Sequence, residues 1–212
     1  MKVQNNFKVQ VPPNHYFNIE YDSKSRWISY WYQINEVINL KPKSVLEIGV
    51  GNKTVSDYLT KIGFRVKTCD LDKSLKPDVV ANILNLPFKI DSFDVVLCAE
   101  VLEHLPFKNF SRALSNIHKV SKKYAIITLP NFSITNLYFG IKVIPYVPKK
   151  EFLIRVGYPV KHKFLGEHYW EIGKKGFPVS LIKESIQKSG FQIKKTYSPI
   201  EDPKHNFFIL EK

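Results

Sequence analysis

Residues 44–54 carry the sequence SVLEIGVGNKT, and this stretch decides the fold of the chain. It begins with a short apolar run from Val45 to Ile48, which is typical of a parallel strand that is covered on both faces. Gly49 and Gly51 follow at once, and glycine allows both a sharp turn and a close approach of the backbone to a bound molecule. The stretch therefore predicts a strand, a tight turn and a helix, with a nucleotide-binding site at the carboxyl end of the strand.

The chain on either side of this stretch alternates between strand and helix patterns. Apolar runs predict strands at 44–48, 65–69, 78–81, 93–98, 123–129, 191–197 and 206–210. Helical spacing of apolar residues predicts a helix from about Ser23 to Pro42, and further helices at 52–62, 107–120 and 180–189. Such alternation is typical of a parallel sheet. The last two strands are joined too tightly for a helical crossover, so we expect them to pair antiparallel.

The alternation of strand and helix patterns stops between Pro130 and Pro178, where proline and aromatic residues are frequent. A long segment without a pattern inside a compact domain is usually a functional lid or a binding loop. The length of 212 residues fits one domain with an elaborated insert. We therefore expect a single domain over residues 1–212, in which an insert at 131–177 and an N-terminal segment at 1–40 cover the active site.

The composition is that of a soluble globular protein, with 44% hydrophobic and 24% charged residues. A net charge of +13 could attract RNA, but lysines scattered singly along a lysine-rich chain are the simpler explanation. Residues 1–14 contain no apolar signal sequence, and prolines and polar residues interrupt the most apolar stretch, Tyr124 to Val147. We therefore expect a cytoplasmic protein without a membrane span.

The two cysteines, Cys69 and Cys98, fall at the ends of predicted inner strands and are interpreted as buried thiols. Neither of the metal-binding patterns C-x-x-C and H-E-x-x-H occurs, so no metal site is expected. The sequence contains no feature that specifies an oligomeric state.

Asp70 ends the second predicted strand. An acid about 20 residues past a glycine turn can accept hydrogen bonds from both ribose hydroxyls of a nucleotide cofactor. Asp72 is interpreted as a solvent-facing or capping residue. The turn fits two fingerprints imperfectly, because Thr54 replaces the last glycine of G-x-G-x-x-G and Lys53 replaces the last glycine of acid-x-G-x-G-x-G. The turn and Asp70 therefore leave NAD and S-adenosylmethionine as alternatives.

Three further sequence segments follow the glycine turn and Asp70 in order along the chain. They are ANILNLPF at residues 81–88, SFDVVLCAEVLEHL at 92–105 and AIITLPN at 125–131. Together with the glycine turn and Asp70, they resemble the class I S-adenosylmethionine-dependent methyltransferases, and among these the type 11-like group. The resemblance covers about residues 44–131, with a weaker match in the C-terminal helix and strands. It implies a Rossmann-like, doubly wound, mostly parallel sheet of seven strands, with an antiparallel last strand and helices on both faces.

The resemblance implies a site for S-adenosylmethionine, with S-adenosylhomocysteine as the product. Glu47, Gly49 and Gly51 would surround the methionine moiety, with Glu47 near its amino group. Asp70 would bind the ribose, and Leu71 would pack on the adenine.

The remaining cofactor contacts that the resemblance implies come from two loops. Asn82 stands where the family usually has an aspartate that bonds the adenine amino group, and an amide oxygen can accept the same bond. The backbone N–H of Ile83 would reach the adenine ring. Cys98, Ala99 and Glu100 would form the floor beside the sulfonium.

Three residues are candidates for acid–base catalysis. His168 lies in the aromatic insert, where methyltransferases of this group often place a histidine that faces the substrate. His104 lies just past the fourth predicted strand, at the rim of the expected pocket, and a capping or packing role is an equal alternative for it. Glu100 can also serve as acid or base, although its simpler role is electrostatic. Arg26, on the predicted N-terminal helix, can clamp the cofactor carboxylate as in similar enzymes.

The leading hypothesis is an S-adenosylmethionine-dependent methyltransferase that acts on an oxygen or nitrogen atom of a small or medium-sized acceptor in an aromatic-lined pocket. An RNA methyltransferase is the first alternative, and its RNA contacts would be Lys142, Lys149, Lys150, Arg155, Lys161 and Lys163. No N-P-P-Y or D-P-P-Y follows the fourth strand, which disfavours methylation of base amino groups. Two other classes are a NAD-dependent oxidoreductase and a non-catalytic cofactor-binding module in which Lys53 and Asn82 weaken the site.

Overall fold

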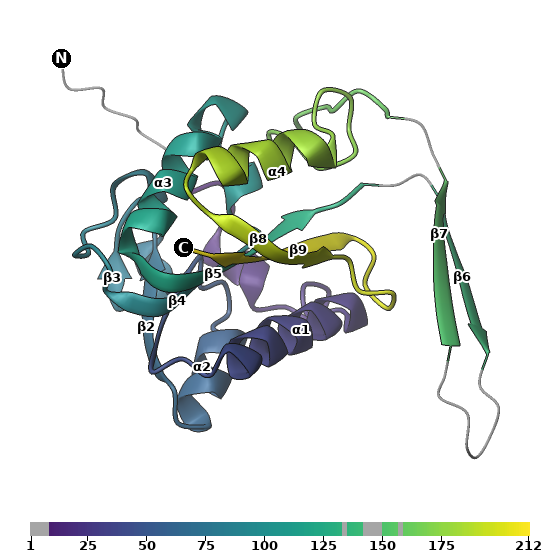
Figure 1. Ribbon diagram of the computed structural model, residues 1–212. Helices are drawn as coiled ribbons and strands as arrows, with labels where there is room; N and C mark the ends of the chain where they lie inside the picture. Colours follow the sequence, from purple (N-terminus) through teal and green to yellow (C-terminus); the bar gives the residue numbers. More distant parts are fainter. Residues whose placement is uncertain (1–8, 133–134, 142–149, 157–158) are drawn as a thin grey trace.

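The structure is a computed structural model that describes residues 9–132, 135–141, 150–156 and 159–212. A seven-stranded sheet with the strand order β3-β2-β1-β4-β5-β9-β8 forms its centre (Figure 1). Its strands are β1 (Ser44–Ile48), β2 (Arg65–Asp70), β3 (Val79–Val80), β4 (Phe93–Ala99), β5 (Ser121–Pro130), β8 (Gln192–Tyr197) and β9 (His205–Glu211). The α-helices of the described residues are α1 (Lys24–Leu40), α2 (Thr54–Lys61), α3 (Phe110–Val120) and α4 (Val179–Lys188).

The strand pairing confirms the predicted Rossmann-like sheet. β1 pairs parallel with β2 on one side and with β4 on the other, and β4 pairs parallel with β5. These parallel pairs require long crossovers, and α2 and α3 lie in the connections. β9 is antiparallel to both of its neighbours, β5 and β8. The connection from β8 to β9 is too short to contain a helix, which accounts for the antiparallel pairing of these two strands.

Apolar side chains fill the space on both faces of the sheet. On one face, α3 and α4 pack against a layer that includes Leu46 and Val96. On the other face, α1 and α2 pack against a layer that includes Val45 and Val95 (Figure 1). Successive residues of a strand point to opposite faces, so a strand buried on both sides is apolar along its whole length.

The longest described helix, α1, begins at Ser23, whose side chain accepts a hydrogen bond from the N–H of Arg26. It ends before Pro42, with Lys41 in a left-handed conformation. Neither α1 nor any other helix of the described residues is both long and apolar enough to cross a membrane.

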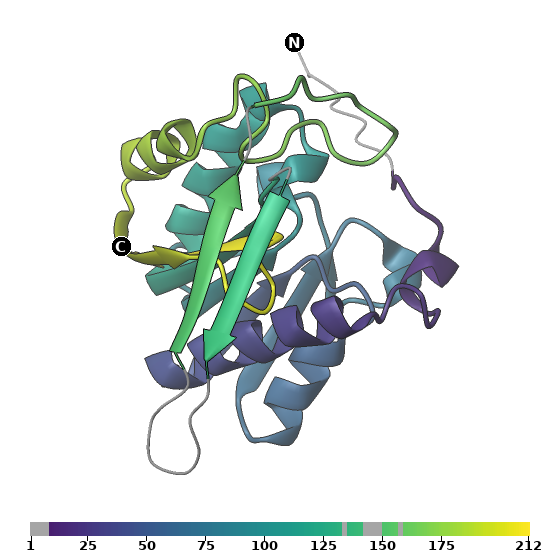
Figure 2. The ribbon, with the colours of Figure 1, turned by 90° about the vertical axis from the view of Figure 1, so that its right-hand side faces the viewer.

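The insert contains a hairpin where the sequence pattern predicts no regular structure, so the prediction is wrong there. β6 (Thr135–Ile141) pairs antiparallel with β7 (Lys150–Val156) in a separate two-stranded sheet. The hairpin, drawn in green, stands apart from the central sheet in Figure 1 and lies in front of the rest of the molecule in Figure 2. The sequence LYFGI at the end of β6 lacks the polar alternation that marks a half-exposed strand, so the sequence pattern does not indicate a strand here.

A later part of the insert is anchored to the main domain by Trp170. The side chain of Trp170 is fully buried, and its indole N–H donates a hydrogen bond of 3.0 Å to the carbonyl of Leu105. The rings of Phe107, Phe110 and Phe177 surround it. This packing holds the neighbouring insert residues beside the loop that follows β4.

Candidate functional site

The glycine turn after β1 is packed tightly against the segment that follows β4. Gly49 has a φ of +83°, and a Cβ atom at this position would lie 2.2 Å from Cγ2 of Val101. Gly51 has a φ of +48°, and a Cβ there would lie 3.6 Å from both Tyr16 and Tyr21. Both glycines adopt left-handed conformations, and at Gly49 the lack of space also excludes a side chain.

Lys53 takes the place of a third glycine in this turn. Its φ of +65° is left-handed, a conformation that glycine adopts more easily, and it stands at the N-cap of α2. The Nζ atom of Lys53 donates a hydrogen bond to the carbonyl of Lys76. Lys53 is not one of the described residues that line the cavity beside the turn. The turn therefore keeps a glycine-like backbone while the lysine side chain lies elsewhere.

A cavity of about 540 Å³ opens at the carboxyl ends of β1, β2 and β4. Nine of the ten residues that the resemblance assigns to the cofactor line this cavity: Glu47, Gly49, Gly51, Asp70, Leu71, Asn82, Ile83, Ala99 and Glu100. The tenth, Cys98, is fully buried in the sheet, where it lies between Ile48 and Ile127. Cys69 is also buried, so the interpretation of both cysteines as buried thiols is confirmed.

Glu47 presents a buried carboxyl group to this cavity. The residue is 5% exposed, and its Oε2 atom has no hydrogen-bond partner among the described residues. Burial raises the pKa of Glu47 to about 8. A cationic group of a ligand beside this carboxyl group would supply the missing partner and would favour the charged form.

Asp70 connects the end of β2 to the glycine turn. Its two carboxylate oxygens accept hydrogen bonds of 2.8 Å from the N–H groups of Val50 and Asp72. Burial raises the pKa of Asp70. Leu71, the next residue, is apolar but keeps 37% of its surface exposed beside the cavity. The end of β2 thus presents a carboxylate and an apolar surface side by side.

The side-chain oxygen of Asn82 already forms one hydrogen bond within the protein. Its Oδ1 accepts a hydrogen bond of 2.8 Å from the N–H of Leu84 and so caps the short 3-10 helix η3 (Ile83–Asn85). The carbonyl of Ile83 accepts a hydrogen bond of 3.0 Å from Nδ2 of Asn116. The amide of Asn82 therefore has one lone pair of its oxygen, together with its NH₂ group, left for a ligand.

The N-terminal segment forms an outer wall of the cavity. Residues of this wall are Val9, Gln10, Val11, Tyr16, Tyr21, Arg26, Tyr30 and Gln33. The guanidinium of Arg26 lies 4.4 Å from the centre of the Tyr21 ring. Asn52 of the glycine turn donates a hydrogen bond of 2.8 Å to Asp22, which ties the wall to the turn. The predicted position of Arg26 beside the cofactor site is therefore compatible with the geometry.

A second cavity of about 470 Å³ adjoins the first. The residues that line both cavities are Val11, Tyr16, Tyr21, Arg26, Glu100 and His104. The insert, the end of β5 and the start of β9 supply further walls of the second cavity: Pro130, Asn131, Phe132, Glu167, His168, Glu171, Lys204 and His205. The two cavities thus meet at Glu100 and His104, just past the end of β4.

The insert brings His168 next to His104 at this meeting point. The N–H of Tyr169 donates a hydrogen bond of 2.8 Å to the carbonyl of Glu103, beside the anchor at Trp170. The two imidazole rings lie 4.9 Å apart between centres and nearly perpendicular. Burial, with a smaller effect of His168, lowers the pKa of His104 to about 4. Two predicted catalytic histidines, far apart in the sequence, therefore lie side by side.

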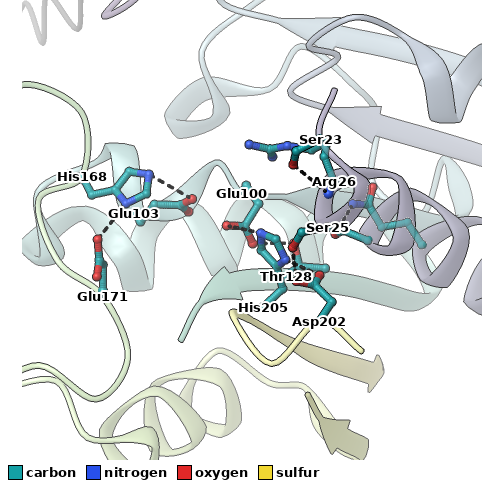
Figure 3. A network of polar contacts seen from close by, with 12 residues as sticks. Ser23, Ser25, Arg26, Glu100, Glu103, Thr128, His168, Glu171, Asp202 and His205 are labelled. Atoms are coloured by element: carbon teal, nitrogen blue, oxygen red, sulfur yellow. Dashed lines mark hydrogen bonds and ion pairs between the residues drawn. The ribbon is translucent and has the colours of Figure 1, made fainter. Parts of the chain in front are cut away.

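Glu100 belongs to a polar network with two residues that the sequence analysis did not single out, Asp202 and His205 (Figure 3). The Nδ1 atom of His205 pairs with Asp202, and its Nε2 atom lies 3.6 Å from Oε2 of Glu100. Thr128 donates a hydrogen bond of 2.8 Å to the other carboxylate oxygen of Glu100. Burial by itself lowers the pKa of His205, but the Glu100 and Asp202 carboxylates outweigh it, so the net shift is upward.

No local sequence motif marks the Asp202–His205 pair. Asp202 lies in the short connection before β9, and His205 is the first residue of that strand. Only the antiparallel register, in which His205 stands opposite Pro130, brings this histidine to the carboxyl end of β5. Such a position depends on the pairing of strands and not on a local motif.

Of the basic insert residues predicted to contact RNA, Lys161 and Lys163 are exposed. Lys150 and Arg155 stand on β7, whereas Lys142 and Lys149 lie outside the described residues. RNA binding by these residues stays a prediction.

Known proteins match the part of the chain that forms the first cavity. A family model described as a methyltransferase domain matches residues 46–129. The ubiquinone biosynthesis O-methyltransferase of Coxiella burnetii is 34% identical over 88 residues, which cover 34% of this chain and 37% of that protein. The chain thus spans well under half of the length of this curated relative.

Solved structures share the fold over most of the chain. The 1,6-didemethyltoxoflavin-N1-methyltransferase of Burkholderia thailandensis, solved with S-adenosylhomocysteine, has a TM-score of 0.60 at 14% identity and covers 94% of this chain and 84% of that chain. The magnesium protoporphyrin IX methyltransferase of Synechocystis PCC 6803, also solved with S-adenosylhomocysteine, has a TM-score of 0.61 at 14% identity and covers 89% and 84%. At this level of identity, the likeness shows a shared fold.

Proposed function

We propose that the protein is an S-adenosylmethionine-dependent methyltransferase that acts on a small or medium-sized molecule, since residues 46–129 match the methyltransferase domain family. The observation that carries the proposal is the pair of adjoining cavities that meet at Glu100 and His104. The first cavity has the features of a cofactor site, and the second offers polar groups to an acceptor. Group transfer requires two such sites with a common boundary.

The first cavity fits the chemistry of S-adenosylmethionine. The unpartnered oxygen of Glu47 suits the amino group of the methionine moiety. The carboxylate of Asp70 suits the ribose hydroxyls, and the exposed surface of Leu71 suits the adenine ring. The carboxylate of Glu100 lowers the cost of removing a sulfonium cation from water. When bound, the cofactor supplies a methyl group that the charge on sulfur has already activated.

The residues of the chain then have to align the acceptor and accept its proton. Alignment of two bound reactants supplies roughly 7–11 kcal/mol of the barrier reduction. Tyr16, Tyr21 and Arg26 line the wall that both cavities share. His168, His104 and Glu100 face the second cavity and are the candidates that accept a proton from an oxygen or nitrogen acceptor. A general base contributes about 10²–10⁴-fold.

Calorimetric titration with S-adenosylmethionine and S-adenosylhomocysteine tests the cofactor assignment, with NAD as the control. We expect saturable binding of both adenosyl ligands and none of NAD. Binding of NAD alone would assign the protein to the oxidoreductases instead.

Transfer of a labelled methyl group to a panel of small phenols, alcohols, amines and RNA tests the acceptor class. We expect transfer to a small molecule. Transfer to RNA alone would favour the RNA methyltransferase, and cofactor binding without transfer to any acceptor would favour the non-catalytic module. The cytoplasmic location stays a prediction from the sequence, which cell fractionation can test.

A further inference from the structure

Glu103 carries a carboxyl group that is buried without a partner. It lies in the short 3-10 helix η4 (Leu102–His104), directly after β4, and is 0% exposed. Neither of its two side-chain oxygens has a hydrogen-bond partner among the described residues. Buried carboxyl groups are normally hydrogen-bonded, paired with a cation or bound to a metal. Within the described part of the chain, Glu103 therefore lacks the partner, a hydrogen-bond donor, a cation or a metal ion, that a buried carboxyl group normally has.

Two imidazole nitrogens approach this carboxyl group from the side of the second cavity. The Nε2 atoms of His104 and His168 each lie 4.0 Å from Oε1 of Glu103. Both histidine side chains are about one-third exposed, at 33% and 29%, so they stand between the buried carboxyl group and the cavity. Figure 3 shows the approach of His168 to Glu103.

The other ring nitrogen of each histidine is held by an oxygen acceptor. Nδ1 of His168 lies 3.0 Å from a carboxylate oxygen of Glu171. Nδ1 of His104 lies 2.7 Å from Oε1 of Gln10, whose NH₂ group faces the carbonyl of His104. An oxygen acceptor at Nδ1 favours an N–H there, so Nε2 of each neutral ring carries a lone pair, and both Nε2 atoms lie 4.0 Å from Oε1 of Glu103. This pattern is typical of histidines that bind metals, which donate their second N–H to a carboxylate or carbonyl oxygen.

We propose that Glu103, His104 and His168 bind one divalent transition-metal ion of the Zn²⁺ type at the boundary of the two cavities. The three ligand atoms lie within 4.8 Å of one another. Bonds of about 2.0–2.2 Å to one ion require only a small closure of the two rings toward Glu103. Two imidazoles with one carboxylate favour Zn²⁺, Fe²⁺ or Ni²⁺ over Mg²⁺ and Ca²⁺, which prefer oxygen ligands.

A role for this ion follows if the proposed function holds. Three protein ligands leave a coordination position open, and the open side faces the second cavity, where the acceptor would bind. A divalent ion lowers the pKa of a hydroxyl group that binds to it, so the hydroxyl loses its proton to water near neutral pH. The acceptor atom would then be an oxygen, and His104 and His168 would position the ion that activates it instead of accepting the proton themselves.

The test is zinc binding by the full chain after treatment with a chelator, measured by calorimetry with ZnCl₂ in the absence of cofactor and acceptor. We expect one saturable site per chain, and weaker binding of MgCl₂. Glu103→Gln and His168→Ala should each weaken zinc binding at least about 100-fold, because they remove ligands. Glu171→Gln should weaken it about 10–100-fold, as is usual for a residue that orients a ligand. His118→Ala is the control, because His118 lies on α3 against Phe191 and should leave the affinity unchanged.

Circular dichroism and titration with S-adenosylhomocysteine of each variant separate a lost site from a lost fold. Folded wild-type protein that shows no saturable zinc binding would overturn the proposal, and so would zinc binding that is equal in the wild type, Glu103→Gln and His168→Ala. Zinc binding without binding of S-adenosylhomocysteine would leave the metal site standing and reject the proposed function. Binding of S-adenosylhomocysteine without zinc would do the reverse.

Discussion

The side chain of Val101 fills the space beside Gly49, since a Cβ atom on Gly49 would lie 2.2 Å from Cγ2 of Val101. The contact joins the turn after β1 to the segment after β4, and both segments line the first cavity. Because real Cβ atoms do not approach other carbons so closely, a side chain at position 49 has to push these two segments apart. The shape of the first cavity therefore depends on the glycine.

Gly49→Ala should weaken both the fold and the binding of S-adenosylhomocysteine. Overpacking of a tight site costs about 1–3 kcal/mol of stability. A loss of about 1.4 kcal/mol in binding corresponds to a tenfold lower affinity. Urea unfolding and calorimetry measure the two effects. Gly63→Ala is the matched control, because Gly63 also has a left-handed φ, of +101°, but a Cβ there would meet no atom within 4 Å. Equal affinities of the two variants would contradict the expectation.

Glu47 should couple cofactor binding to proton exchange. Burial raises its pKa to about 8 in the free protein. The bound pair consists of a carboxylate and an ammonium group. Below about pH 8 the carboxyl group must lose a proton on binding. The affinity for S-adenosylhomocysteine should therefore rise as the pH increases toward 8.

Calorimetry in two buffers of different ionisation enthalpy measures this exchange. At a pH about one unit below the pKa of Glu47, binding should release a proton from the wild-type protein and none from Glu47→Gln. Glu184→Gln, an exposed change on α4, should behave like the wild type. Proton release from Glu47→Gln that equals the wild-type value would show that another group exchanges the proton.

Asn82→Asp should tighten the binding of S-adenosylhomocysteine. Oδ1 of Asn82 already caps Leu84, and an aspartate would keep this cap and add a second carboxylate oxygen for the adenine amino group. One additional hydrogen bond contributes about 1 kcal/mol, or about a fivefold gain in affinity. Calorimetry measures the gain. Asn85→Asp adds the same charge at an exposed position of the same short helix and should have no effect. A gain in both variants would show that the charge acts at long range.

The part of the first cavity that the glycine turn and Asp70 form could be predicted from the sequence, because these residues belong to local patterns. Parallel strands that are buried on both faces are continuous apolar runs, and the glycine turn and Asp70 stand at the ends of such runs. The strand pattern indicated that Cys98 is a buried thiol, whereas the resemblance placed it at the floor of the cofactor site; successive residues of a strand point to opposite faces, so Cys98 and Ala99 do not share a face. Cys98 accordingly lies in the core, whereas its neighbour Ala99 lines the cavity.

The Asp202–His205 side of the second cavity and the buried face of α1 could not be predicted, because contacts with residues far along the chain determine them. Trp27 and Trp31 are 54% and 57% exposed, although they share the helical spacing of apolar residues. Glu36 is buried instead, since it accepts hydrogen bonds from Lys195 and Tyr197 on β8. A local periodicity contains no information about partners so far along the chain.

Asp202→Asn should lower the pKa of His205 and reduce stability more at low pH than at high pH. The carboxylates of Glu100 and Asp202 raise the pKa of His205 above its ordinary value of 6.5, despite the opposing effect of burial. The protonated histidine therefore contributes stability that is complete below pH 6.5 and is lost as the pH rises through the folded-state pKa. An asparagine keeps an acceptor for the hydroxyl of Ser25, which bonds Asp202 at 2.7 Å, so the variant removes mainly the charge.

Titration of the histidine ring signals by NMR gives the pKa of His205, and urea unfolding at about pH 6 and pH 9 gives the stability of both proteins. The stability difference between the wild type and Asp202→Asn should be larger at pH 6, where His205 is charged. His118 provides the internal control, because it lies on α3 and its pKa should not change. An unchanged pKa of His205 would mean that Glu100 alone holds its proton, and the ion pair at the boundary of the two cavities would then be independent of Asp202.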